Sequence, residues 1–165
     1  MTTRAPVRPD LSDPNVLAGV RQIQLKAAQG NFRAFLKLCV TKDADGYLVP
    51  VPIALFPGEP DPLQERIDSG ELQPRPAPWP HITEMAADLG SGVSVKYLKA
   101  RQMMFTWVLA AFCVYKASIR GDVFYLSQGE KYAQAVIERC KYIWDNLPVE
   151  VRGPRKKGGK WNDEE

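Results

Sequence analysis

The spacing of apolar residues predicts helices near the start of the chain. Between residues 16 and 27 apolar side chains recur every three or four positions, after Asp13-Pro14, a capping residue followed by a first-turn proline. The spacing breaks at Gly30 and resumes over the next ten residues. Residues 13–41 are therefore expected to form two short helices or one interrupted helix, a packing segment without chemistry of its own.

Proline and charge replace this spacing in two other stretches. Residues 1–12 offer little apolar surface for burial, and we expect a flexible tail. Residues 42–80 are rich in proline, glycine and acid, which is typical of an ordered connection rather than a site. Pro50 and Pro52 allow at most an edge strand there.

The central part of the chain alternates between strand and helix patterns. A helix is expected at about 82–89, and the β-branched and aromatic run 93–98 then follows a Gly-Ser-Gly turn. Residues 103–117 are apolar nearly all round, as in a helix covered on several sides. A second apolar run, 123–128, precedes a helix with one apolar stripe at 129–147. The order strand, loop, helix, strand, helix predicts an α/β domain with a parallel sheet.

The loop between the first strand and its helix carries the candidate chemistry. In the standard phosphate-binding loop, G-x-x-x-x-G-K-S/T, backbone N–H groups hold phosphate at a helix N-terminus, a lysine reaches the outer phosphates and the hydroxyl holds Mg²⁺. Counting back from Thr106 puts Phe105 in the lysine place, Met104 in the second glycine place and Lys99 in the first. The standard pattern is therefore not met, although a hydroxyl and two cations, Lys99 and Arg101, remain.

The segment KARQMMFTW resembles the phosphate loop of bacteriophage terminase large subunits, the ATPases that package DNA into capsids. Their loop typically reads K-x-R-Q-x-G-x-S/T-W, with the lysine moved to its front. The matching positions are Lys99, Arg101, Gln102, Thr106 and Trp107, whereas Met104 stands where the family usually has glycine. A later stretch resembles the family's strand ending in serine and the helix after it, at Ser127, Gln128, Ala133, Ala135 and Arg139. Roughly residues 32–148 can be mapped in this way.

The resemblance implies a fold and a set of ligands. Residues 81–148 would be the front part of a P-loop NTPase-like domain, with an incomplete parallel sheet and flanking helices, and residues 149–165 a basic flexible tail. ATP and Mg²⁺ would be the cofactors, with Thr106 on the metal and Trp79 or His81 near the adenine, although both rings are more often packed against their own domain. The expected nucleotide-binding residues of the loop are Lys99, Ala100, Arg101, Gln102, Met103, Met104, Phe105 and Thr106.

The same resemblance implies partners and a place of action. Double-stranded phage DNA, the portal, the small terminase subunit and further copies of the chain would be its partners, in the cytoplasm of the infected bacterial host. A helicase-like motor of the same superfamily is an alternative. A non-catalytic α/β module that binds DNA or a virion protein is another, because Met104 and Phe105 permit a loop that has lost its nucleotide.

Other features of the chain narrow these functions. No apolar strand ending in Asp-Glu follows residue 128, and no nuclease carboxylates are present, so no catalytic residue is assigned and ATP turnover by this chain alone is not expected. The formal charge of +3 does not by itself indicate nucleic acid, and no run of about 18 apolar residues predicts a membrane span. Three widely spaced cysteines indicate reduced, buried thiols, and a single histidine leaves little for a zinc cluster or a Ser-His-Asp triad.

Overall fold

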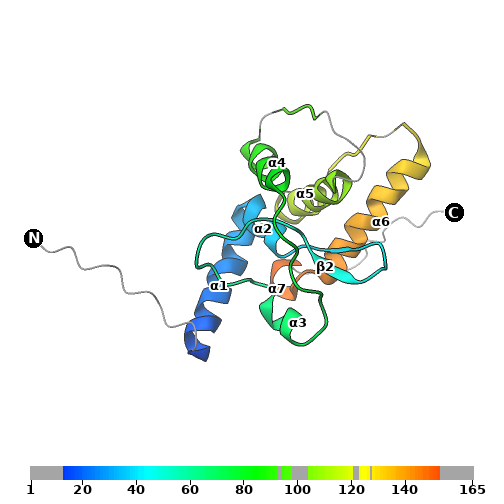
Figure 1. Cartoon of the computed structure of the whole chain (residues 1–165). Helices are drawn as coiled ribbons and strands as arrows, with labels where there is room; N and C mark the ends of the chain where they lie inside the picture. Colours follow the sequence, from blue (N-terminus) through cyan, green and yellow to red (C-terminus); the bar gives the residue numbers. More distant parts are fainter. Residues whose placement is uncertain (1–12, 93, 98–103, 121–122, 127, 153–165) are drawn as a thin grey trace, which may run out of the picture.

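The computed structural model describes residues 13–92, 94–97, 104–120, 123–126 and 128–152. Helices dominate this part of the chain, with one small sheet (Figure 1). The expected flexible tail at 1–12 lies outside the described residues, as does the basic stretch from residue 153. The elements in chain order are α1 (Pro14–Gly30), α2 (Phe32–Lys37), β1 (Val40–Lys42), β2 (Leu48–Pro50), α3 (Gln64–Asp68), α4 (Pro80–Ser91), α5 (Phe105–Arg120), α6 (Glu130–Asn146) and α7 (Val149–Arg152).

The N-terminal segment forms two helices, because the chain supplies a cap for each. The Asp13 carboxylate accepts a hydrogen bond from Asn15 N at 2.8 Å, and Pro14 occupies the first turn of α1. Asn31 ends α1 by donating its backbone N–H to Ala27 O and begins α2 by accepting from Ala34 N. One asparagine thus serves both helices, and the chain changes direction there.

The proline-rich connection is held to the helices by a buried ion pair. Arg75 makes two hydrogen bonds to the Asp61 carboxylate, and its remaining donors reach Val51 O at 2.7 Å and Lys37 O at 2.8 Å. Only 9% of each side chain of the pair is exposed. The guanidinium therefore joins the end of α2, the strip after β2 and the loop before α3.

The core lies where α2 meets α1, α4 and α5 (Figure 1). Phe32 and Phe35 of α2 are buried there, and the Phe32 ring packs edge-on against Phe112 of α5 at 5.0 Å between centroids. The helix α6 then packs against α5 through residues such as Ile143, which is fully buried. This arrangement fixes the N-terminus of α5 beside the first turns of α6.

The parallel sheet predicted for the central region is absent from the described residues. The two strands found there, β1 and β2, form an antiparallel hairpin with Val40 opposite Pro50 and Lys42 opposite Leu48. Residues 94–97 and 123–126, predicted as strands, adopt no regular structure. A continuous apolar run predicts a strand only when neighbouring strands cover both its faces, and Phe124 and Leu126 are 90% and 93% exposed.

The end of the described chain also departs from prediction. Residues 149–152, assigned to the flexible basic tail, form the short helix α7, and Val151 is buried. This helix contacts α1, and Glu150 O accepts a hydrogen bond from the Gln29 side chain. Burial of an apolar side chain explains why these four residues are ordered although Pro148 ends α6 before them.

Candidate functional site

The junction between the loop and α5 has an unusual backbone conformation. Met104, directly before α5, has a φ of 53°, and no other described non-glycine residue has a positive φ. Its carbonyl accepts the first helical hydrogen bonds, from Trp107 N at 3.0 Å and Val108 N at 3.1 Å. An L-residue in the left-handed region costs on the order of 1–2 kcal/mol, so packing must hold this turn in place. The Met104 side chain contributes by packing against the main core.

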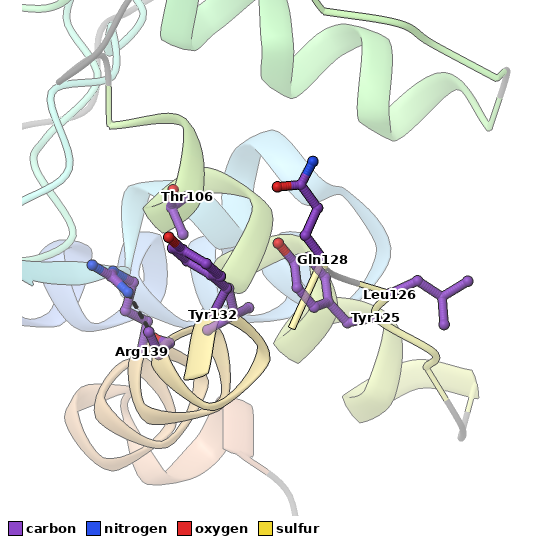
Figure 2. A pocket seen from close by; sticks show the side chains of 8 residues that line it. Thr106, Tyr125, Leu126, Gln128, Tyr132 and Arg139 are labelled. Carbon is purple, nitrogen blue, oxygen red and sulfur yellow. Dashed lines mark hydrogen bonds between the residues drawn. The ribbon is translucent and has the colours of Figure 1, made fainter. Parts of the chain in front are cut away.

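A pocket opens beside the first turn of α5. It has a volume of about 650 Å³ and lies between that turn, residues 125, 126 and 128, and the first half of α6 (Figure 2). A volume of this size falls within the roughly 300–1,000 Å³ usual for small-molecule sites. The described residues that line it are Thr106, Tyr125, Leu126, Gln128, Tyr132, Ala135, Val136 and Arg139.

Arg139 supplies the positive charge of this pocket. Its Nη1 donates to Ala135 O at 2.7 Å, one turn earlier on α6, and its guanidinium carbon lies 5.4 Å from the Trp107 ring centre. The Nε atom is shielded from solvent and has no hydrogen-bond acceptor among the described residues. Since none of the described lining residues is acidic, this part of the pocket favours an anion.

The helix termini add to this electrostatic character. The first N–H groups of any α-helix lack intrahelical acceptors and carry the positive end of the helix dipole. Thr106 stands in the first turn of α5 with its side chain facing the pocket (Figure 2). A hydroxyl at this place can coordinate a cation or donate to an anion. The pocket therefore combines a guanidinium, a helix N-terminus and a hydroxyl.

The other residues predicted for the site lie elsewhere or cannot be placed. Lys99, Ala100, Arg101, Gln102 and Met103 are outside the described residues. Phe105 is partly buried, and its ring packs edge-on against Tyr97 at 5.3 Å, which agrees with a packing role in the lysine place.

The two rings predicted near the adenine do not line the pocket. Trp79 and His81 lie at the start of α4, with ring centres 5.5 Å apart. Trp79 donates its backbone N–H to Pro52 O, which ties it to the strip after β2. The structure thus brings neither ring to Thr106.

Several lining residues were not predicted as site residues. Gln128, Ala135 and Arg139 were noted only as matches to the terminase pattern, and Tyr125 and Tyr132 were not singled out. Tyr132 lies on the exposed side of α6, where a helical apolar stripe suggests packing. The sequence position of Arg139 could have indicated a site, because a cation among the apolar positions of a helix must find a partner or a ligand.

Within the described part of the chain, no group of three or more His, Cys, Asp or Glu side chains is placed to hold a metal ion. Among the same residues, no helix is long and apolar enough to cross a membrane.

Comparison with known proteins gave no further assignment. No protein-family model matched the chain, and no curated protein or solved structure matched it either. The observations that bear on function are therefore the geometry of the pocket and the sequence resemblance.

Proposed function

We propose that this chain carries the front part of a DNA-packaging ATPase domain of the terminase large-subunit type. In this proposal the pocket beside α5 takes the phosphates of ATP with Mg²⁺. Phage DNA, the portal, the small subunit and other copies of the chain are the partners that such a motor would require. The proposal rests on the loop sequence together with the conformation of the loop's end.

The left-handed backbone of Met104 is the observation that carries the proposal. The terminase pattern places glycine at this position, and glycine is the residue that adopts positive φ without steric cost. The chain has methionine there, yet the backbone keeps a conformation suited to glycine. The residue directly before α5 therefore has the backbone conformation that the glycine of the pattern would supply.

The residues around Met104 fit the nucleotide in charge and position. Thr106 occupies the hydroxyl place of the pattern and lines the pocket, and Arg139 adds a cation from α6. No protein-only metal cage is required, because Mg²⁺ in such sites is held by one hydroxyl, water and the phosphates themselves. Lys99 and Arg101, by the resemblance, would approach from the loop.

The two segments that were predicted as strands fit the same proposal. Residues 94–97 precede the loop and residues 123–126 follow α5, which are the places of the sheet strands in the predicted order. We propose that they become strands of a parallel sheet when further strands pair with them. The exposure of Phe124 and Leu126 supports this, since a missing neighbour would cover them.

Titration of a fluorescent ATP analogue into the 165-residue chain tests the nucleotide site. With Mg²⁺ present, Lys99→Ala should remove a charge-assisted contact of roughly 1.5–3 kcal/mol and weaken binding about ten- to a hundredfold. Thr106→Ala should weaken binding by about tenfold, and this effect should vanish in EDTA because the hydroxyl acts through the metal. Arg139→Gln should weaken binding with or without the metal.

Matched variants separate the site from general effects. Lys96→Ala removes an exposed lysine close to the loop, Ser118→Ala removes a hydroxyl at the far end of α5, and Lys131→Gln removes an exposed cation of α6. All three should bind the analogue as the unchanged chain does. Equal affinity for Lys99→Ala, Thr106→Ala and these controls would contradict the proposal, as would the absence of binding.

A non-catalytic binding module is the second candidate. Phe124 and Leu126 favour it, because two nearly fully exposed apolar side chains, two positions apart on a segment without regular structure, are suited to receiving a strand of another protein. The binding-module function would be favoured if the titration shows no nucleotide binding while circular dichroism shows that the variants remain folded.

A further inference from the structure

The three cysteines of the chain occupy different environments. Cys39 is fully buried, and its thiol donates to Phe35 O at 3.5 Å. Cys113 of α5 is partly exposed, whereas Cys140 of α6 is buried. All three thiols are free. Cys113 and Cys140 belong to the two helices that line the pocket, and neither has a role in the proposed function.

The thiols of Cys113 and Cys140 meet across the contact between α5 and α6. Cys140 Sγ lies 3.6 Å from Ala110 O, on the turn of α5 directly before Cys113. Helical side chains lean toward the N-terminus, so the Cys113 side chain covers that same turn. The largest influence on the pKa of each thiol is the other thiol, as expected for two sulfurs that face each other across this contact. The sulfurs are therefore neighbours although 27 positions separate the residues in the chain.

We propose that Cys113 and Cys140 form a reversible intramolecular disulfide, with Cys113 as the thiol that reacts first with an oxidant of the hydroperoxide class. The two neighbouring sulfurs need to approach each other to the bonded distance of about 2.05 Å. Cys39 takes no part in this pair, since its thiol is fully buried and donates to Phe35 O.

The electrostatics of the pair assign the order of reaction. The neighbouring Cys140 thiol lowers the pKa of the Cys113 thiol, even though partial burial opposes this. The Cys113 thiol and burial raise the pKa of Cys140. Burial also raises the pKa of Cys39. Since the thiolate is the nucleophile, Cys113 is the reactive and accessible group, and Cys39 is inert.

The chemistry balances in two steps. The Cys113 thiolate attacks one oxygen of the hydroperoxide, the O–O bond breaks, and Cys113 becomes a sulfenic acid as water or an alcohol leaves. The Cys140 sulfur then attacks the Cys113 sulfur, so that the S–S bond forms, the S–O bond breaks and a second water leaves with the Cys140 proton. Two equivalents of a small thiol return both cysteines to the reduced state by exchange.

The bond would tie the two walls of the pocket together. Cys140 directly follows Arg139, and Cys113 lies two helical turns, about 10 Å, beyond Thr106 on α5. A covalent link at this point fixes the spacing of α5 and α6 beneath the pocket. Oxidation therefore rigidifies the structure that holds Thr106 and Arg139.

Oxidation of the whole chain with hydrogen peroxide tests the proposal. After denaturation, alkylation and proteolysis, mass spectrometry should find the peptides of Cys113 and Cys140 joined and Cys39 alkylated. No disulfide should join two molecules, and the melting temperature should rise by roughly 5–10 °C, returning to the original value with dithiothreitol.

Single variants provide the controls. Cys39→Ala should still form the bond, and Cys140→Ala should stop at a sulfenic acid on Cys113 that dimedone labels. Three results would overturn the proposal: a lasting sulfenic acid on Cys113 of the unchanged chain, a link that involves Cys39 or a second molecule, or three cysteines that all remain open to alkylation.

Discussion

At the scale of single residues, Met104 shows how a position can keep a conformation that its side chain disfavours. Glycine is usually about 0.5–1 kcal/mol less favourable than alanine because it loses more backbone entropy on folding. At a positive φ the order reverses, since alanine keeps the steric cost and glycine does not. Met104 has a φ of 53° and packs its side chain on the core, so strain and packing oppose each other there.

Comparison of Met104→Gly with Met104→Ala separates these two contributions. Both variants lose the side-chain packing, but only glycine relieves the backbone, so the glycine variant should be more stable by about 1 kcal/mol. Urea unfolding measures this difference. Gln134, an exposed position within α6, serves as the control. There Gln134→Ala should be more stable than Gln134→Gly by about 1 kcal/mol. An alanine variant at 104 as stable as the glycine variant would show that the turn is unstrained.

At the scale of elements, local pattern predicted the helices well and the long-range contacts poorly. The expected helices at 82–89, 103–117 and 129–147 correspond to α4, α5 and α6, because apolar spacing and breakers such as Pro148 act within a few residues. No local sequence pattern predicts the ion pair of Arg75 with Asp61. Its partners come from loops of irregular structure, and only the folded chain shows that both are buried.

The Arg75–Asp61 pair should be the most sensitive charged contact of the proline-rich connection. Arg75→Gln leaves the Asp61 carboxylate buried without its partner and also removes donors to Val51 O and Lys37 O. Loss of one member of a buried pair costs about 3–5 kcal/mol, which would be a large part of the stability of a domain of this size. Thermal and urea unfolding of the variant measure this cost.

The exposed pair of Arg21 with Glu65 is the matched control. Its side chains are 44% and 75% exposed, and Arg21→Gln should change the free energy of unfolding by less than about 1 kcal/mol. Similar losses for Arg75→Gln and Arg21→Gln would mean that solvent screens the Arg75 pair as well.

At the scale of the whole molecule, the sequence placed strands at 93–98 and 123–128, where the described residues form none. The runs 94–97 and 123–126 have the composition of buried strands, yet burial depends on neighbours that composition cannot supply. For the same reason, Thr106 is the one described lining residue of the pocket that the sequence predicted as a site residue. Its other wall, with Tyr132 and Arg139, exists because α6 packs against α5, and this contact joins residues far apart in the chain.

The arrangement of charge over the molecule leads to a last prediction, that nucleotide binding and hydrolysis are separable in this chain. Hydrolysis requires an acidic group that positions the attacking water and helps to hold Mg²⁺. The lining residues that the structure describes include a hydroxyl and a guanidinium but no carboxylate. The chain should therefore bind the ATP analogue yet release phosphate at least about a thousandfold more slowly than the roughly 1–100 s⁻¹ of working phosphoryl-transfer enzymes such as kinases.

A steady-state phosphate-release assay tests this prediction, with Lys99→Ala as the background. Glu164→Gln is the second control, because Asp163-Glu164-Glu165 is an acidic group in the sequence that lies outside the described residues. If these carboxylates do not reach the pocket, the unchanged chain and both variants should share the same low rate. A rate well above that of Lys99→Ala, and reduced by Glu164→Gln, would instead place the missing acid at the end of this chain and make it a complete catalyst.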